Sequence, residues 1–428
     1  MSDTPTIEND YKDNTFDMFR HSAQRELFEI KSFNQWRDSA TENKNYVFET
    51  VHQAAQYPEI SIKRDTGEQL NVINFGCYNY LGYSYHPEVI AATKEALDTY
   101  GLGSAAAPIT SGTLEIHSEL EKKALEFFGL DDKKLTLFSS GFAANLGTIQ
   151  AFLGPGCHII LDQYAHMSLI EGARMSQASI SFFRHNQMAS LEKHLKKSAR
   201  SKARTLVCTE GIFSADGNYG KLNEIVSLAK QYGAYTLVDE AHSALVAGES
   251  GRGVCEMQNV LSDVDFYIMT FSKAFGGIGG AVLTKESIGK YINWYATCRM
   301  FSCAMSPPMA GGLTKVFELV QNSDGANRRK RLHENAAYMR EKLRDKVDIG
   351  SSESWIIPVI YGKENKTLDI NNFIQQNGLE AGIMQFPAVS KNQARLRLFV
   401  TSEHTRKHLD RAADIILEAA RQFNFNLG

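Results

Sequence analysis

The sequence lacks the long apolar runs of a membrane protein, and no stretch of its 428 residues approaches a bilayer span, so we expect no transmembrane segment. It also lacks a cysteine framework. Its six cysteines are scattered without a CxxC pair, which disfavours zinc sites and disulfide scaffolds and fits a reducing cytoplasm. We therefore expect no metal and a cytoplasmic location. The polar, acidic start of the chain has neither the basic end nor the apolar core of a secretory leader, so we expect none.

Strong charge of one sign is missing as well. The net charge is −3, which gives no electrostatic reason to expect nucleic acid as a partner. Nucleotide-binding loops are also absent. The run GGIGG at 276–280 does not continue as G-x-G-x-x-G, because Val282 occupies the last position, and no P-loop spacing occurs. These absences exclude a Rossmann dinucleotide site.

An ordinary globular composition is present, with 43% apolar and 22% charged residues in a chain too long for one core. From the changes of pattern along the chain we predict an N-terminal arm at 1–60, a large domain at 61–311 and a smaller domain at 312–428. The basic helical stretch from Asn327 (NRRKRLHENAAYM) is more typical of a solvated helix face than of a nucleic-acid contact.

Short apolar strands alternate with helices through the middle of the chain. Strands that are apolar throughout and separated by helices indicate a mostly parallel sheet covered on both faces, which is an α/β fold, with a smaller α+β domain after it. The segments that carry this pattern are LTLFSSGFAANLG, HIILDQYAHMSL, RTLVCTEGIFSADG, AYTLVDEAHSALV and FYIMTFSKAFGG.

Polar residues follow each of these strands, at the edge where ligands bind in open α/β sheets. Each one alone has a plain structural explanation: a helix cap, a core histidine or a surface lysine. Together they form a set that chance explains poorly: a serine-glycine helix start at 139–142, two histidines, a carboxylate and a lysine. The candidate residues are Gly141, Phe142, His166, Ser214, Asp239, His242, Thr270 and Lys273.

Pyridoxal 5'-phosphate is the cofactor whose chemistry uses this set. It needs a lysine for its Schiff base, here Lys273, and a carboxylate against the pyridine nitrogen, here Asp239. The helix start at Gly141 and Phe142 with Thr270 would bind the phosphate, and His166 would lie flat over the ring. The glycines after Lys273 would let cofactor and backbone approach closely.

The blocks SSGFAANLG, YAHMSLIEGAR, EGIFSADG, LVDEAHS, GESGRGV and TFSKAFGGIGG resemble the signatures of the α-oxoamine synthases, in the family's order. That family has the fold-type I architecture of pyridoxal phosphate enzymes, similar to aspartate aminotransferase. The resemblance implies a homodimer with active sites at the interface. It also implies a decarboxylative condensation of an amino acid with an acyl thioester, either acyl-CoA, the usual carrier, or an acyl carrier protein, that gives an α-amino ketone.

Residue roles follow from the same resemblance. Lys273 would carry the cofactor and then remove the α-proton, and His166 would stack on the ring and help to orient the amino-acid carboxylate. Asp239 would face the pyridine nitrogen, His242 and Ser214 would lie near the phenolic oxygen, and Thr270, Gly141 and Phe142 would hold the phosphate; Asn79 and Arg397 would lie near the substrate.

Two departures from the family pattern bear on the substrate. Gln385 stands where many members have an arginine, and Pro108 replaces another arginine of the loop after Gly103. The long N-terminal segment and YNYLG lean toward serine palmitoyltransferase, whereas AHMSLIEGAR and VSKNQ lean toward the autoinducer synthases. Two alternatives stay open: another fold-type I enzyme, such as an aminotransferase or lyase, and a non-catalytic partner subunit, against which the presence of Lys273 argues.

Overall fold

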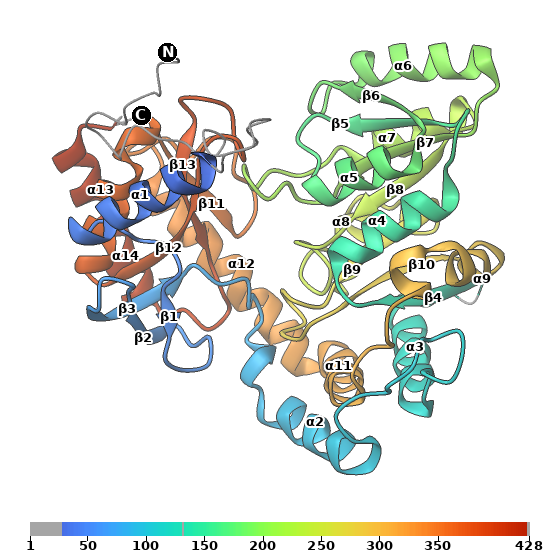
Figure 1. Cartoon of the computed structure of the whole chain (residues 1–428), viewed down its shortest axis with the longest axis horizontal. Coiled ribbons are helices and arrows are strands. Elements are labelled where there is room, and N and C mark those ends of the chain that lie inside the picture. The colour runs from blue at the N-terminus through green and yellow to red at the C-terminus, as the bar shows by residue number, and fades with distance from the viewer. Residues whose placement is uncertain (1–27, 131, 426–428) are drawn as a thin grey trace. The chain divides into compact units, whose positions relative to one another are not determined.

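The computed structural model describes residues 28–130 and 132–425, and these form two compact units (Figure 1). Unit 1 takes in the described residues up to Cys77, residues 215–217 and those from Leu332 onward. Unit 2 takes in residues 78–214 and 218–331. The domain boundaries predicted from the sequence, 1–60, 61–311 and 312–428, stay a prediction, and residues 1–27 of the predicted arm lie outside the described residues.

The described part of unit 2 is built on a seven-stranded sheet with the order β4-β10-β9-β8-β7-β5-β6. Five neighbouring strands, from β9 to β6, run parallel, and only β10 is antiparallel to its neighbours β4 and β9. The predicted mostly parallel sheet is therefore confirmed. Its strands are β4 Lys133–Phe138, β5 His158–Asp162, β6 Ser179–Phe183, β7 Thr205–Glu210, β8 Tyr235–Asp239, β9 Phe266–Thr270 and β10 Gly280–Lys285.

Helices pack on both faces of this sheet because its strands are apolar on both sides. One buried cluster joins Ile159 and Leu161 of β5 to residues of α4, α5 and α9. A second joins Ile160, on the opposite side of the same strand, to residues of α6 and α7. The helices of unit 2 are α2 Pro87–Tyr100, α3 Glu115–Phe128, α4 Gly141–Phe152, α5 Met167–Ser176, α6 Met188–Ser201, α7 Leu222–Gln231, α8 Val254–Met257, α9 Glu286–Tyr295, α10 Thr297–Met300 and α11 Pro307–Val320.

The described part of unit 1 has its own six-stranded sheet, with the order β1-β2-β3-β12-β13-β11. Strands from the two ends of the chain meet in it, because β3 runs parallel to β12 with Ile73 opposite Leu379. Its elements are α1 Phe28–Glu42, β1 Val51–His52, β2 Glu59–Lys63, β3 Gln69–Phe75, β11 Ile356–Gly362, α13 Thr367–Gln376, β12 Leu379–Met384, β13 Ala394–Phe399 and α14 Arg406–Phe423, while α12 Ser323–Leu343 continues from unit 2 into unit 1.

Within the two described ranges, no helix combines the length and the apolar character needed to cross a membrane. The same residues contain no cluster of three or more histidine, cysteine, aspartate or glutamate side chains that could hold a metal ion.

Candidate active site

Lys273 stands three residues beyond the end of β9, and its amine is hydrogen-bonded to a histidine. Lys273 Nζ lies 2.9 Å from His242 Nε2, and His242 Nδ1 lies 2.8 Å from the hydroxyl of Tyr80. The Tyr78 ring centroid is 5.8 Å from the same amine, within cation–π range. The structure thus brings the predicted Lys273 and His242 together and adds two tyrosines from the segment CYNYLG, in which the sequence singled out only Asn79.

Asp239 is the last residue of β8 and is buried. Its Oδ2 accepts a hydrogen bond from Asn145 Nδ2 at 2.6 Å, and its Oδ1 accepts one from the backbone N–H of Ala241 at 2.9 Å. Asn145 Nδ2 also donates to Ser168 Oγ at 2.9 Å. These bonds hold the carboxylate in one orientation while leaving acceptor positions on both oxygens for a ligand.

His166 caps the N-terminus of α5. Its Nδ1 accepts the backbone N–H of Ser168 at 3.2 Å and lies 2.8 Å from the Ser168 hydroxyl. A backbone N–H can only donate, so Nδ1 is the acceptor and Nε2 carries the proton of the neutral ring. The imidazole is exposed, and its ring stands edge-on to that of Phe142, with centroids 6.3 Å apart. The cap therefore presents an N–H donor at Nε2.

The start of α4 forms an anion-binding arrangement with the end of β9. The N–H groups of the first helical turn have no intrahelical acceptor, and the Ser140 side chain satisfies only that of Ala143, at 3.0 Å. Thr270 Oγ1 lies 2.9 Å from Ser272 Oγ at the end of β9. A Cβ built on Gly141 would come within 2.6 Å of Thr270 Cβ and 2.8 Å of Thr270 Oγ1, so the helix start packs directly against the Thr270 side chain.

Glu210 is a buried carboxyl at the end of β7, and the sequence did not single it out as a site residue. It accepts the backbone N–H of His166 at 2.6 Å. Burial raises the pKa of Glu210 well above its usual range, and the nearby Asp239 carboxylate raises it further, while the His166 N–H and Lys273 act in the opposite direction. The signal that could have found it was a charged residue at the end of the strand TLVCTE.

The remaining predicted residues are more dispersed. Ser214 lies in the turn after β7, and Asn79 is buried, with its Nδ2 lacking a hydrogen-bond partner among the described residues. Arg397 belongs to unit 1, where it lies on β13 with its guanidinium 4.7 Å from the centroid of the Phe399 ring. Gln385, at one of the two family departures, is buried in unit 1, just beyond β12.

Comparison with known proteins identifies the family. Residues 71–416 match the family model for class I and II aminotransferases. The chain is 38% identical to 8-amino-7-oxononanoate synthase of Thermoanaerobacter pseudethanolicus over 82% of its own length and 89% of the relative's. It is 32% identical to serine palmitoyltransferase 3 of Mus musculus, over 98% of this chain and 74% of that one. The chain belongs to the α-oxoamine synthase family.

Solved structures of the α-oxoamine synthases agree with this. The serine palmitoyltransferase of S. paucimobilis, solved with a pyridoxal phosphate–myriocin aldimine bound, superposes with a TM-score of 0.87, at 28% identity, covering 94% of this chain and all of that one. The serine palmitoyltransferase of Sphingomonas wittichii gives a TM-score of 0.86 at 29% identity, over 94% of this chain and 99% of that one. The predicted fold-type I architecture is confirmed.

The residues of this α-oxoamine synthase also fit the family's cofactor, pyridoxal phosphate. An amine, a buried carboxylate and a helix start with two hydroxyls match its aldehyde, its ring nitrogen and its phosphate. All three groups lie in unit 2, at the ends of neighbouring strands β8 and β9 or at the helix that follows β4. The parts of this site that were not predicted from the sequence are Tyr78, Tyr80, Asn145, Ser168 and Glu210.

Proposed function

We propose that this chain condenses an amino acid with an acyl thioester, with loss of carbon dioxide, to give an α-amino ketone, as a pyridoxal phosphate-dependent C-acyltransferase related to serine palmitoyltransferase. The observation that carries the proposal is the Lys273–His242 contact in the same unit as the Asp239–Asn145 pair, in a chain related throughout to enzymes of this class. When bound, the cofactor supplies an electron sink for the charge that develops at the amino acid's α-carbon.

The chain's own groups divide the remaining work. Lys273 takes the α-proton, and its hydrogen bond to His242, which continues to Tyr80, gives the amine neighbours that can accept or supply a proton. Asp239, which Asn145 holds in place, would face the cofactor's ring nitrogen as a fixed anion. The Nε2–H group of His166 orients the amino-acid carboxylate. Gly141, Phe142 and Thr270 would hold the phosphate, and Ser214 and His242 would lie near the phenolic oxygen. In unit 2, Asn79 would contact the substrate; the substrate role of Arg397, which lies in unit 1, stays a prediction from the family resemblance.

A homodimer is part of the proposal. Two loops of unit 2 carry large apolar side chains into solvent: Leu102 and Phe301 are each 80% exposed. The loops lie side by side, because Ser306 Oγ donates to the Leu102 carbonyl at 2.6 Å and the Ala304 N–H donates to the Ala106 carbonyl at 3.0 Å. Large apolar side chains exposed on adjacent loops are typical of an interface between subunits. All six cysteines lie within the described residues, where they form no disulfide and two are buried, which supports a cytoplasmic location.

The test is a titration of the purified protein. We would add pyridoxal phosphate and record the visible spectrum, then add glycine, alanine, serine, 2-aminobutyrate or cysteate, with and without a long-chain acyl-CoA. We expect a yellow protein whose band shifts with one amino acid, and carbon dioxide release only when the thioester is present. The amino acid that gives both responses identifies the substrate.

Two controls separate the alternatives. Lys273→Ala should abolish turnover, whereas Lys122→Ala, at a side chain 74% exposed on α3, should not alter it. A protein that stays colourless after cofactor addition would favour a non-catalytic subunit. A keto acid formed without thioester would show an aminotransferase instead.

A further inference from the structure

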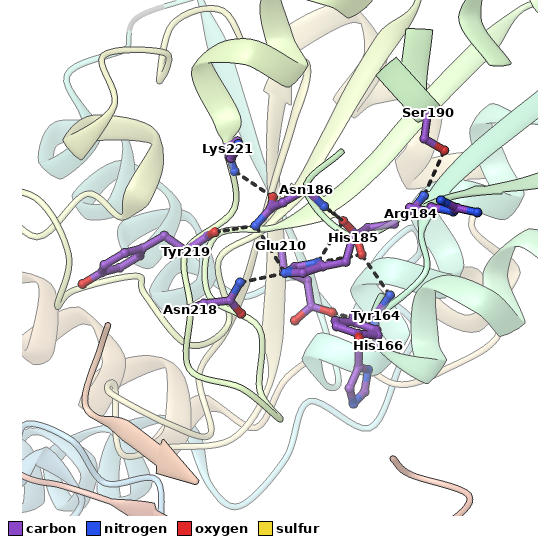
Figure 2. Close-up of polar contacts among 11 residues, drawn as sticks. Tyr164, His166, Arg184, His185, Asn186, Ser190, Glu210, Asn218, Tyr219 and Lys221 are labelled. Atoms are coloured by element: carbon purple, nitrogen blue, oxygen red, sulfur yellow. Dashed lines mark hydrogen bonds and ion pairs between the residues drawn. The ribbon is translucent and has the colours of Figure 1, made fainter. Parts of the chain in front are cut away.

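A second group of polar residues lies at the same edge of the sheet and centres on His185, which the proposed function does not use (Figure 2). His185 follows β6, and its Nδ1 lies 3.0 Å from Oδ1 of Asp162, the fully buried last residue of β5. Asp162 also accepts the backbone N–H of Tyr164 at 2.9 Å and that of Asn186 at 3.2 Å. Three donors thus fix this carboxylate.

The other ring nitrogen of His185 faces a different part of the chain. Asn218 Nδ2 lies 2.7 Å from His185 Nε2, and Asn186 Nδ2 lies 3.2 Å from it. The orientation of the Asn186 amide is determined, because its Oδ1 accepts the N–H of Lys221 at 3.1 Å and its Nδ2 donates to the Tyr219 carbonyl at 2.9 Å. His185 Nε2 is therefore the acceptor, and Nδ1 carries the proton that is donated to Asp162.

Two aromatic side chains hold the His185 ring between them. Tyr164 stacks on it with centroids 4.6 Å apart and planes at 25°, and Phe213 meets it edge-on at 4.4 Å. Tyr164 is two residues from His166, and Phe213 is adjacent to Ser214. His185 thus contacts two segments to which it does not belong. It contacts Asp162 and Tyr164 in the segment that carries His166, and Phe213 and Asn218 in the segment that carries Ser214.

We infer that His185 is a positioning residue of this enzyme, which ties the segment that carries His166 to the segment that carries Ser214. The backbone N–H of His166 is bound to Glu210 of β7, and the Gln163 N–H of the same segment donates to the Phe183 carbonyl of β6 at 3.0 Å. What the Asp162–His185 pair adds is a connection that continues through Asn218 to the Ser214 segment. With this connection in place the imidazole of His166 keeps its position relative to Ser214 while the substrate reacts, and small displacements of a positioning group have large effects on rate.

Two variants of His185 separate the effect of its hydrogen bonds from the effect of its aromatic ring on the position of the two segments. His185→Phe keeps a ring between Tyr164 and Phe213 but loses the bonds to Asp162 and Asn218. His185→Gln keeps an N–H for Asp162 and an oxygen for Asn218 but loses the ring. The matched control is His158→Phe. His158 is a buried histidine at the first residue of β5, the strand that ends at Asp162, and it is bonded to Ser181 Oγ of β6 at 2.9 Å.

The first measurement is amide hydrogen exchange of the full chain without cofactor. We expect His185→Phe to exchange faster than the wild type in peptides containing Tyr164 and His166 and in peptides containing Phe213 and Ser214, but not in β7 or β8. His158→Phe should leave these site peptides unchanged, and His185→Gln should stay within about threefold of the wild type. Asn218→Ala should loosen only the Ser214 segment, and it serves as the test if His185→Phe does not fold.

The second measurement is steady-state kinetics of the cofactor-loaded enzyme, and it rests on the proposed function. We expect His185→Phe to bind the cofactor as the wild type does, with kcat lower by about tenfold or more. Faster exchange throughout unit 2, or site peptides and kcat equal to those of His158→Phe, would overturn the inference. So would a His185→Gln variant more impaired than His185→Phe. Because hydrogen exchange needs no turnover, its result is independent of whether condensation is found.

Discussion

Gly141 offers the sharpest test of how the helix start of α4 builds the proposed phosphate site. A Cβ added here would lie 2.6 Å from Thr270 Cβ and 3.3 Å from Thr270 Cα. Neither atom moves when the threonine side chain rotates, so the new methyl group can be accommodated only if the two backbones separate. An ordinary contact begins at 3.4 Å, which requires a displacement of 0.8 Å.

The expected magnitudes follow from that displacement. Overpacking of this kind costs about 1–3 kcal/mol, and the better helix propensity of alanine returns at most about 1 kcal/mol. A helix start displaced by 0.8 Å brings its N–H groups out of hydrogen-bond range of a phosphate held by Thr270. One charge-assisted hydrogen bond contributes about 1.5–3 kcal/mol, so we expect Gly141→Ala to weaken cofactor binding at least about tenfold.

The assay is a titration of the cofactor-free protein with pyridoxal phosphate, followed by visible absorbance, together with thermal unfolding. The matched control is Gly154→Ala, just beyond the other end of α4, where an added Cβ meets nothing within 4 Å. We expect this control to bind cofactor normally and to gain about 0.4–1 kcal/mol in stability. Equal cofactor affinities for the two variants would refute the reasoning.

Two further predictions concern charge. Asp239→Asn keeps the shape of the side chain but removes the anion, and we expect a rate about a hundredfold lower or more at saturating cofactor; an unchanged kcat would show that the ring nitrogen needs no anionic partner. In unit 1, burial raises the pKa of Glu380 to about 7 and lowers that of His404 to about 3. Folded Glu380 keeps a proton that the unfolded chain releases, so its contribution to stability is lost as pH rises from 4.5 to about 7, whereas that of His404 is lost as pH falls from 6.5 to about 3. Between pH 4.5 and 6.5, Glu380 therefore makes the free energy of unfolding fall with pH, whereas His404 makes it rise. Glu380→Gln removes the first effect, so its urea midpoint should rise with pH across this window more steeply than that of the wild type. Parallel profiles of midpoint against pH would contradict the raised pKa of Glu380.

The strand-end residues could be predicted from the sequence because the pattern that makes a buried parallel strand also marks where it ends. Asp239 is the last residue of β8, and Lys273 stands three residues beyond β9. Parallel neighbours have their carboxyl ends at one edge, so local patterns were enough to bring these side chains together. Asn145 carries a weaker signal of a different kind, because it is a buried polar residue in the mostly apolar helix GFAANLGTIQAF, which also contains the buried Thr148.

Other features depend on pairings between distant residues that no local pattern encodes. Tyr80 and His242 are 162 positions apart, and either could equally have been read as a core residue. The parallel pairing of β3 with β12 joins segments from opposite ends of the chain, and its register depends on the packing of the whole of unit 1. The Asp162–His185 pair likewise joins the end of β5 to the residues after β6, and neither an aspartate nor a histidine shows from the sequence which residue it will bond.

The run of glycines after Lys273 was noticed in the sequence, but the explanation given for it was incomplete. The sequence suggested that they make room for the cofactor, but the chain's own atoms occupy the space. A Cβ on Gly276, whose φ is +71°, would lie 2.2 Å from the backbone nitrogen of Ser84, and one on Gly280 would lie 2.5 Å from that of Gly141. The first contact holds the Tyr83–Ser84 turn against the lysine loop, and the same segment carries Tyr80, the partner of His242. The glycine at 276 is therefore required by the packing that brings Tyr80 to His242, and through His242 to the amine of Lys273, whether or not a ligand is bound.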